Sequence, residues 1–350
     1  MSQKNCVIFG GSGCIGTHAA QHFLEHSDFD QIFLADMRPP VQANYTRKLQ
    51  EGLKNNRAVF VTQDVRKPIQ NANLPERCTT VLNFAAVHRE PGHAPREYYE
   101  TNILGAENVC AYASTAGAAQ MIFTSSIAPY GSSEEIKNED SLPVPETPYG
   151  GSKLVAEKIH LAWQQANPAR KLAVLRPGVV FGPGEHANVS RLVRSLVKGY
   201  FFYTGNKTTR KAGVYVKELC HVMRFALQYQ MTNSLPVVLW NVSADPPPTV
   251  EDFVQATCRV TGRKRRPLSI PRSVLMGLSY PIAALARVFK IQQPIHPVRM
   301  RKLFRSTNIE PKRLREAGYH WRFTLDQAFS DWKKDAPEDF FYDEPNYSPS

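Results

Sequence analysis

Short apolar runs recur along the chain and alternate with longer polar-and-apolar stretches. Seven runs are rich in β-branched and aromatic residues, at 6–10, 31–36, 58–64, 80–86, 121–126, 172–177 and 237–243. The early runs are separated by stretches long enough for one helix each. Nearly continuous apolar strands that alternate with helices are typical of a parallel sheet covered on both faces. The pattern therefore predicts an α/β fold, a doubly wound parallel sheet of about seven strands.

The regular alternation of predicted strands and helices ends at about residue 180, and loops and helices follow. We expect residues 1–180 to form the sheet domain, with the later strand near 237–243 returning to it. Residues 181–335 are expected to form mainly a smaller C-terminal lobe for substrate. The acidic, Pro-rich segment 336–350 is expected to be a flexible tail.

A glycine-rich turn follows the first predicted strand and opens the first predicted helix. Gly10, Gly13 and Gly16 are spaced three apart in GGSGCIG, and Asp36 ends the second strand twenty residues later. Such glycines permit a tight turn and close approach of a pyrophosphate, and the acid binds an adenosine ribose. A flexible turn that binds nothing is the alternative. The combination favours a Rossmann-type fold that binds NAD rather than NADP, although Arg38 lies close to the acid.

Tyr149 and Lys153 lie four residues apart in PYGGSK, a spacing that places both on one face of a helix. A tyrosine is a poor base at neutral pH, and a nearby ammonium favours its phenolate form. Such a phenolate takes a proton from an alcohol while hydride leaves the same carbon. Ser126, at the end of the fifth strand, is the candidate hydroxyl partner. An ordinary surface pair on a helix is the alternative reading of the spacing alone.

Taken together, these motifs resemble an extended short-chain dehydrogenase/reductase of the NAD-dependent epimerase/dehydratase family. Further matches are QDV, NFAA, TNILGAENV, FTSSIAPYG, LRPGVVFGPG, VYVKEL and WNVS. The resemblance implies NAD, hydride transfer, frequent homodimers and a catalytic set of Ser126, Tyr149 and Lys153. The cofactor contacts that it implies are Gly10, Gly13, Cys14, Ile15, Gly16, Asp36, Asp64, Val65, Ala85, Ala86, Lys153 and Pro177.

Two departures from the family pattern narrow the expected reaction. Ile127 and Ala128 stand where dehydratases of the family carry Asp-Glu, which leaves a 4-epimerase with a transient 4-keto intermediate or a plain dehydrogenase. The run Arg176-Pro-Gly-Val179 replaces the Arg-Tyr-Phe-Asn that usually binds the diphosphate of a nucleotide sugar. A net sugar or hydroxysteroid-type dehydrogenase and a non-catalytic NAD-binding regulator remain the alternatives.

A narrower resemblance, to polyprenyl-diphosphate-linked N-acetylhexosamine 4-epimerases, comes from AAVHRE, GEHANVSRLVRSLVKGYFFYTGN and RKAGVYV. It implies a small-molecule substrate, a diphosphate-linked sugar on a lipid or nucleotide carrier. The candidate substrate contacts are His88, Arg89, Asn188 and Lys211. Which sugar, which carrier and which direction of epimerisation stay open at this point.

The net charge of +12 is concentrated near the C-terminus, where fourteen Lys and Arg between 263 and 315 face one acid, Glu310. The segment 270–289 is apolar, interrupted by Pro281 and too short to span a bilayer. Peripheral membrane contact through 263–305 and a buried helix with a basic surface are both consistent with this composition. No nucleic-acid module is recognisable, so a nucleic-acid partner is not expected.

Cysteine and histidine usage points away from metal and disulfide chemistry. The six cysteines are scattered without paired spacing, which fits a reducing compartment and argues against a zinc site. His18, His22 and His26 share one face of the first helix, and a surface stripe is the expected explanation because no other ligand joins them. We expect no metal, and a cytoplasmic location with peripheral contact at the inner face of the membrane.

Overall fold

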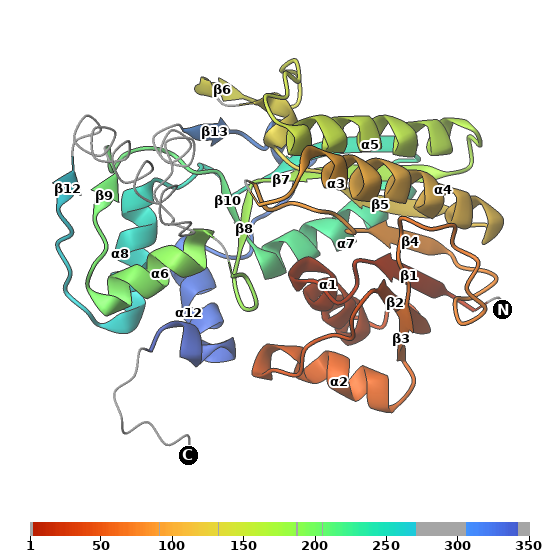
Figure 1. The fold of residues 1–350 in the computed structure, drawn as a ribbon, viewed down its shortest axis with the longest axis horizontal. Helices are drawn as coiled ribbons and strands as arrows, with labels where there is room; N and C mark the ends of the chain where they lie inside the picture. The colour runs from red at the N-terminus through yellow and green to blue at the C-terminus, as the bar shows by residue number, and fades with distance from the viewer. Residues whose placement is uncertain are drawn as a thin grey trace.

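A computed structural model describes residues 3–341 except 91, 132, 187, 205 and 271–305. Seven parallel strands form one sheet in the order β11-β7-β5-β4-β1-β2-β3 (Figure 1). They are β1 (Asn5–Phe9), β2 (Gln31–Asp36), β3 (Ala58–Thr62), β4 (Thr80–Asn83), β5 (Gln120–Thr124), β7 (Lys171–Pro177) and β11 (Val237–Val242). The predicted doubly wound parallel sheet is confirmed. The order reverses between β1 and β4, where doubly wound sheets bind ligands.

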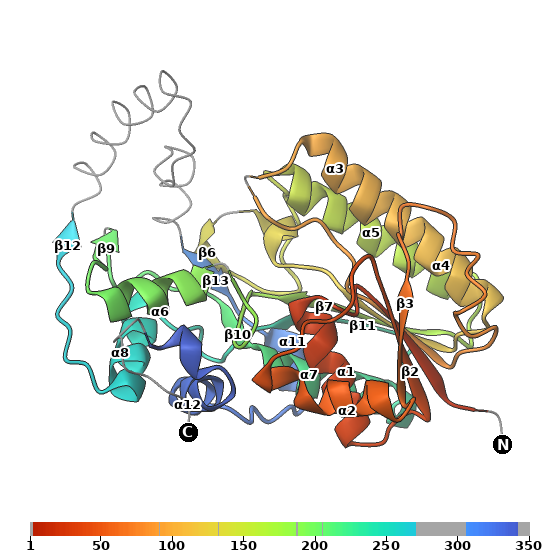
Figure 2. The same ribbon diagram turned by 60° about the horizontal axis from the view of Figure 1, so that its bottom comes forward.

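Helices cover both faces of this sheet, as Figure 2 shows. One face carries α1 (Cys14–Glu25), α2 (Arg47–Lys54) and α7 (Val216–Thr232), with the short turn η1 (Asn44–Thr46). The other carries α3 (Pro95–Tyr99), η2 (Glu100–Leu104), α4 (Gly105–Thr115) and α5 (Pro148–Gln165). Alternate residues of β1 pack into the two layers, Ile8 with the first and Val7 with the second. Both faces being buried explains why the strands read as continuous apolar runs.

A smaller lobe lies beside the sheet domain, on the side away from β3 (Figure 1). It contains the parallel pairs β8 (Val179–Phe181) with β10 (Gly213–Tyr215) and β9 (Tyr203–Thr204) with β12 (Ser269–Ile270). Its helices are α6 (Asn188–Lys198), α8 (Val250–Thr261) and α12 (Leu325–Asp335), followed by the turn η4 (Pro337–Asp339). Aromatic residues fill its core, among them Phe181, Phe329 and Trp332.

A third group of elements joins the lobe to the sheet. Strands β6 (Ser133–Lys137) and β13 (Thr307–Ile309) pair in parallel, and the helix α11 (Lys312–Glu316) packs against β11. The turn η3 (Ala128–Tyr130) precedes β6.

Two segments pack differently from most of the range in which the expected domain division places them. Helices α7 and α11 fall within 181–335, yet α7 packs against α1 and β7, and α11 packs against β11. Burying their apolar faces on the sheet assigns them to its domain rather than to the lobe. The tail does not begin at 336, because Phe340 is fully buried against Trp332, whose indole Nε1 donates a 2.9 Å hydrogen bond to Asp339. The rest of the acidic tail, 342–350, lies outside the described residues.

The expected histidine stripe is also wrong, since His18 and His22 are buried on α1. The His18 ring stacks on Tyr45 with ring centroids 5.4 Å apart, and its Nε2 lies 3.0 Å from the carbonyl oxygen of Pro183. His22 packs against His221 of α7, with ring centroids 4.5 Å apart. His22 is internal because α7 packs beside α1 on the same face of the sheet, which the pattern of α1 alone did not indicate.

All six cysteines are free thiols. Within the described ranges, no helix combines the length and the apolarity that crossing a bilayer requires. The apolar segment 271–289 and most of the basic region 263–305 lie outside those ranges.

Candidate active site

The glycine loop between β1 and α1 leaves no room for side chains. Gly10 has φ +74, and a Cβ added there would lie 2.7 Å from the backbone nitrogen of Ala85. A Cβ on Gly16 would lie 2.3 Å from the carbonyl oxygen of Gly10. No side chain caps the N-terminus of α1 at Gly13. The loop thus presents the first backbone N–H groups of α1, a ready site for an anion.

Asp36 stands at the carboxyl end of β2, beside the glycine loop. Its carboxylate accepts hydrogen bonds from the backbone nitrogens of Ser12 at 3.0 Å and Met37 at 2.7 Å. These contacts hold the carboxylate next to the loop, where the expected ribose contact requires it. Cys14 and Ile15 open α1, and the Cys14 thiol points to the carbonyl oxygen of Pro183 at 3.5 Å.

The next pair of expected cofactor contacts lies after β3. The Asp64 carboxylate is bound by the Arg66 guanidinium at 2.7–3.1 Å, which lowers the pKa of Asp64. The Val65 side chain is buried, and a Cβ on Gly105 would lie 2.9 Å from it. Arg66 was not among the predicted residues, and it engages the carboxylate that the resemblance assigns to the adenine.

Tyr149 is placed by the way α5 begins. The Thr147 hydroxyl accepts a hydrogen bond from the backbone nitrogen of Gly150 at 3.1 Å, and Pro148 occupies the first turn. Thr at the N-cap with Pro at the next position is a strong helix start. The Ser152 hydroxyl donates to the Tyr149 carbonyl oxygen and accepts from Asn102 at 2.9 Å. The first turn of α5 is therefore fixed to η2 as well as to its own cap.

The structure brings Ser126 and Tyr149 together, close enough for the Ser126 hydroxyl to favour the phenolate form of Tyr149. Burial nevertheless raises the pKa of Tyr149 to about 12, and the neighbouring hydroxyl only partly offsets the effect. The charge of Glu90 and the phenol of Tyr98 raise the pKa further, and the Tyr98 ring centroid lies 6.2 Å from that of Tyr149. Tyr98 and Glu90 were not predicted, since Tyr98 lies in none of the motifs named above and Glu90 was given no role although it ends the AAVHRE run.

Lys153 is buried on the same face of α5, one turn after Tyr149. Its Nζ lies 4.4 Å from the ring centroid of Phe123, and burial lowers its pKa to about 7. In the protein without cofactor, desolvation disfavours both the phenolate of Tyr149 and the ammonium of Lys153. A further positive charge is needed for the phenolate to form near neutral pH.

A buried ion pair lies behind the catalytic pair. Glu157, the next residue on the same face of α5, binds the Arg176 guanidinium of β7 through both carboxylate oxygens, at 2.8 and 2.6 Å. Glu157 also accepts a hydrogen bond from the Ser125 hydroxyl, next to Ser126. All three side chains are nearly inaccessible. Glu157 therefore connects the strand ends that carry Ser126 to the helix that carries Lys153.

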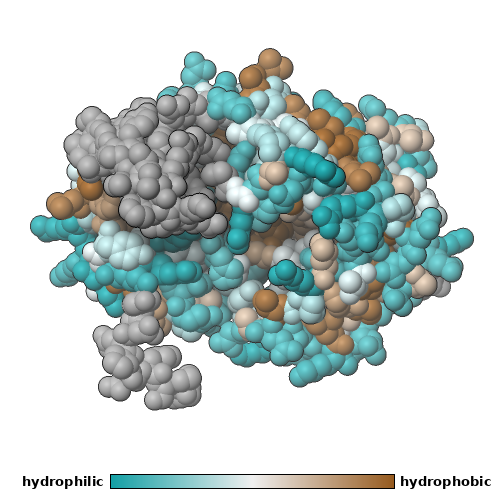
Figure 3. Space-filling view, viewed as in Figure 1, coloured by the Kyte–Doolittle hydropathy of each residue, from teal (hydrophilic) through white to brown (hydrophobic). Residues whose placement is uncertain are grey.

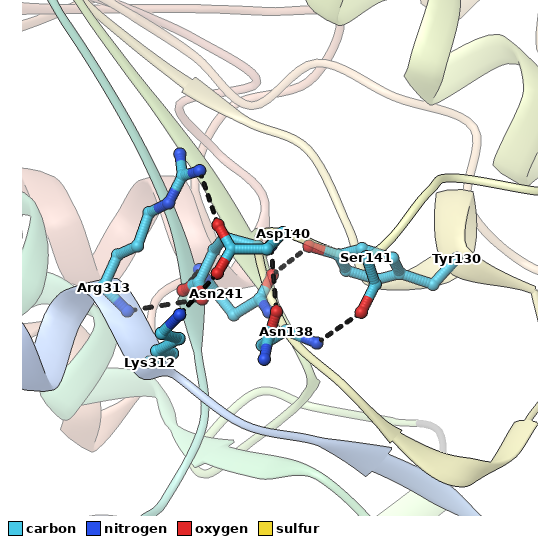
Figure 4. Close-up of polar contacts among 8 residues, drawn as sticks. Tyr130, Asn138, Asp140, Ser141, Asn241, Lys312 and Arg313 are labelled. Carbon is cyan, nitrogen blue, oxygen red and sulfur yellow. Dashed lines mark hydrogen bonds and ion pairs between the residues drawn. The ribbon is translucent and has the colours of Figure 1, made fainter.

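This network continues into the junction with the C-terminal elements (Figure 4). The Arg176 guanidinium lies over the Tyr130 ring at 4.8 Å, and the Tyr130 hydroxyl donates to Asn241 of β11 at 2.9 Å. Beside it, Asp140 accepts from Lys312 at 2.6 Å and Arg313 at 2.9 Å, both on α11. The turn that follows Ser126 is thus anchored to elements more than a hundred residues away.

The four candidate substrate contacts fall into two places. His88 and Arg89 follow β4 with exposed side chains, and desolvation together with the charges of Arg89 and Lys153 lowers the pKa of His88. Asn188 begins α6 in the smaller lobe and is exposed. Lys211 precedes β10, and burial lowers its pKa to about 8. A substrate that contacts all four would bridge the sheet and the lobe.

The remaining predicted cofactor contacts surround the catalytic end. Ala85 lies against the glycine loop, and the Ala86 carbonyl oxygen accepts a hydrogen bond from His88. The carbonyl oxygen of Pro177, at the end of β7, accepts from the backbone nitrogen of Ile127 at 3.2 Å. The ends of β1, β4, β5 and β7 therefore converge on one edge of the sheet.

A protein-family model, described as the NAD dependent epimerase/dehydratase family, matches residues 6–238. The chain belongs to this family. The family member N-acetyl-alpha-D-glucosaminyl-diphospho-ditrans,octacis-undecaprenol 4-epimerase of Escherichia coli O157:H7 is 26% identical over 250 residues, which cover 71% of this chain and 75% of that protein. The UDP-glucose 4-epimerase of Erwinia amylovora is 30% identical over 176 residues, which cover 49% of this chain and 51% of that protein.

Solved structures show the same fold. The UDP-glucuronic acid 4-epimerase of Bacillus cereus in complex with NAD aligns with a TM-score of 0.73 at 17% identity, over 96% of this chain and 100% of that chain. The UDP-Glc/GlcNAc 4-epimerase of Campylobacter jejuni aligns with a TM-score of 0.72 at 20% identity, over 95% and 99%. The smaller lobe is included in both alignments.

This family member is an NAD-dependent enzyme, and its residues fit the cofactor. The cradle that any Cβ on Gly10 or Gly16 would fill admits a pyrophosphate at the start of α1. Asp36 is held beside it with carboxylate oxygens suited to ribose hydroxyls. Ser126 follows β5, and Tyr149 and Lys153 lie on the first turns of α5. A nicotinamide bound at this edge of the sheet would reach the substrate there.

Proposed function

We propose that the protein is an NAD-dependent sugar 4-epimerase that acts through a transient 4-keto intermediate. Its substrate is a diphosphate-linked N-acetylhexosamine. The observation that carries the proposal is the closeness of the Ser126 hydroxyl to the Tyr149 phenol at the sheet edge, with Ile127 and Ala128 directly after Ser126. A phenol beside a hydroxyl serves proton transfer to and from an alcohol, and the two apolar residues supply no acid or base to eliminate water.

The catalytic residues divide the work by their chemistry. Tyr149 removes the proton from the C4 hydroxyl and later returns it to the opposite face of the sugar. Ser126 holds the same oxygen and stabilises the charge that develops on it. Bound NAD supplies the hydride acceptor and a positive ring charge that favours the phenolate. Lys153 is buried on α5 between Tyr149 and Glu157. It would hold the ribose of the cofactor and takes no part in proton transfer.

A lipid carrier is favoured over a nucleotide carrier. A 4-epimerase of an undecaprenol-linked sugar is among the relatives and matches 71% of this chain. The Arg176 guanidinium is bound to Glu157. Gly178 and Val179 have no side-chain amide that could bind a diphosphate oxygen. His88, Arg89, Asn188 and Lys211 are the proposed diphosphate and acyl-amino contacts. Figure 3 shows the molecule hollowed between the lobe and the sheet domain, where such a substrate would lie.

A homodimer and peripheral membrane contact complete the proposal. Leu104 and Val155, on the packed elements η2 and α5, expose 41% and 44% of their surfaces, and Tyr99 beside them 45%. Figure 3 shows an apolar area over α3 and α4. Pairing of this face with its copy in a second protomer would bury it. A dimer in light-scattering measurements that dissociates on Val155→Lys supports this assignment, and a monomeric wild-type protein removes it.

The experiment that tests the activity uses the purified full chain with undecaprenyl-diphosphate-linked and UDP-linked N-acetylglucosamine in parallel. We expect inversion at C4 of the lipid-linked sugar by NMR, without net NADH release. Inversion of only the UDP sugar would overturn the lipid carrier and leave the epimerase standing. Stoichiometric NADH formation without inversion would overturn the epimerase.

A net dehydrogenase is the second candidate, because one relative carries that chemistry. The 3beta-hydroxysteroid-dehydrogenase/decarboxylase isoform 1 of Arabidopsis thaliana is 24% identical over 306 residues, covering 80% of this chain and 66% of that protein. Absorbance at the NADH band during incubation with a 3β-hydroxysteroid decides this case. Steady NADH growth would favour the dehydrogenase over the proposed epimerase.

A further inference from the structure

The outer edge of the smaller lobe carries exposed apolar side chains beside exposed cations. Tyr200, Phe202 and Leu268 expose 62%, 39% and 79% of their surfaces. Lys264, Arg265 and Arg266 are exposed next to them and line the same cleft of about 450 Å³. We call these six residues the β9–β12 surface. Figure 1 places β9 and β12 side by side at the edge of the lobe farthest from β3.

The fold holds the apolar members of this surface outward. The Tyr203 side chain is buried with Leu196 and Val254, and its backbone nitrogen donates to the Leu268 carbonyl oxygen at 2.8 Å. Because neighbouring residues of a strand point to opposite sides, anchoring Tyr203 inward turns Phe202 outward. Leu268 comes immediately before β12 in the adjacent strand. The exposed apolar residues are thus a consequence of a fixed backbone.

The cations are also held in place. Helix α6 ends at Lys198, and Gly199 follows with φ +86. The Arg263 guanidinium donates to the Val197 carbonyl oxygen at 2.9 Å, and the Arg265 guanidinium lies 3.2 Å from where a Gly199 Cβ would be. A helix C-terminus attracts cations through its exposed carbonyl groups. Among the described residues that line the cleft, none is acidic.

We propose that the β9–β12 surface docks on a membrane that contains anionic lipids, with Tyr200, Phe202 and Leu268 in the interface and the cations on headgroup phosphates. Exposed apolar residues surrounded by cations and no acids are the complement of such a surface. An aliphatic residue exposed as fully as Leu268 gains nothing from stacking on a nucleobase, which disfavours single-stranded nucleic acid. The inference deepens the proposed function, because a lipid-linked sugar is reached only by an enzyme at the bilayer.

The test measures flotation of the full chain with vesicles of phosphatidylethanolamine and phosphatidylglycerol, and with vesicles of phosphatidylcholine alone. We expect wild-type protein to float with the anionic vesicles only. Tyr200→Ser with Leu268→Ser should reduce the bound fraction about tenfold. Lys264→Gln with Arg266→Gln should weaken vesicle binding about thirtyfold, because each of the two cations contributes on the order of 1 kcal/mol near an anionic surface.

Matched controls carry the same changes elsewhere on the surface. Leu142 and Met231 are exposed to similar degrees, 77% and 59%, and their Ser variants should float like wild type. Lys54→Gln with Arg77→Gln removes two exposed cations from the sheet domain and should also have no effect. Circular dichroism and C4 inversion of a water-soluble short-prenyl diphosphate sugar should be unchanged in the surface variants.

Three outcomes would overturn the docking surface. They are absence of wild-type flotation, equal losses in the control variants, and a loss with the charge variants but none with the apolar variants. The last would mark a general polyanion site, and competition by single-stranded DNA would identify it. Flotation needs no substrate, so failure of the proposed epimerase leaves this result interpretable, and failure to float leaves the epimerase assay untouched.

Discussion

The catalytic edge of the sheet and the substrate side of the smaller lobe are built in different ways. At the edge, Lys153, Glu157 and Arg176 are almost completely buried, and Glu157 and Arg176 are joined by short, charge-assisted hydrogen bonds. In the lobe, ion pairs such as Arg259–Asp326 are half exposed, and the candidate contact Asn188 is at the surface. Chemistry that tolerates no misplacement is supported by buried partners. Recognition of a large substrate relies on groups that water also reaches.

The largest effect is expected from removing the proton-transfer group at the catalytic edge. Tyr149→Phe should lower kcat by about 10²–10⁴-fold, because the phenol oxygen alone exchanges a proton with the substrate. Folding and the amount of bound NAD should be unchanged, since only a hydroxyl is lost. Tyr112→Phe is the matched control, because the Tyr112 hydroxyl donates to the Pro75 carbonyl oxygen at 2.9 Å and takes no part in the proposed site. A Tyr149→Phe enzyme with near-normal turnover would remove the proposed mechanism.

Much of the catalytic edge could be predicted because its constraints are local. A glycine turn between a strand and a helix, and a Tyr-x-x-x-Lys helix start, bring chemistry together within a few residues. The sheet strands were equally predictable, since burial on both faces makes them apolar throughout.

What could not be predicted depends on residues distant in the chain. Glu157 meets Arg176 across nineteen residues, and α7 buries His22 from about two hundred residues away. The raised pKa of Tyr149 comes from desolvation by the assembled fold, which no spacing records. In the lobe, Asn188 and Lys211 have only weak local signals, so their roles remain predictions.

The second prediction compares ion pairs from the two regions. Glu157→Ala should lower the free energy of unfolding by about 3–5 kcal/mol, because it leaves the Arg176 cation buried without its partner. Asp326→Ala, in the exposed pair with Arg259, should cost only about 0–1 kcal/mol. Urea unfolding of both variants gives the comparison. Equal costs would mean that burial does not distinguish the two regions.

Lys153 makes the catalytic edge sensitive to pH. Its pKa is about 7 in the folded protein and near 10.5 when exposed, so the unfolded chain binds the extra proton between these values. The free energy of unfolding of the NAD-free protein should therefore rise as pH increases from about 7 to 10. Below pH 7 the folded protein bears the full cost of burying the charged Lys153. At pH 6, Lys153→Met should be more stable than wild type by on the order of a few kcal/mol, and this advantage should be smaller at pH 9.

The control for this pH effect lies on the same helix. Lys158 is exposed on α5, and Lys158→Met should change stability little at either pH. Chemical unfolding of the three proteins, stripped of NAD, measures the difference. A Lys153→Met advantage that is the same at pH 6 and pH 9 would show that Lys153 is not a buried, titrating cation.

The smallest expected effect belongs to the lobe. Burial lowers the pKa of Lys211 to about 8, so its positive charge is lost as pH rises through 8. If Lys211 binds the diphosphate, the KM of the wild-type enzyme should rise between pH 7 and 9 while kcat changes less. Lys211→Gln should raise KM about tenfold at pH 7, which corresponds to the lower end of the roughly 1.5–3 kcal/mol that a hydrogen bond to a charged group contributes.

The pH dependence of KM separates this role from a structural one. Lys211→Arg keeps a cation at all these pH values, so its KM should stay level where the wild-type value rises. Lys207→Gln removes an exposed cation paired with Glu251 and should leave KM unchanged. If the wild-type KM is flat from pH 7 to 9, Lys211 does not bind the diphosphate as a cation. The lobe would then recognise its substrate through neutral groups, and its contrast with the charged, buried catalytic edge would be sharper still.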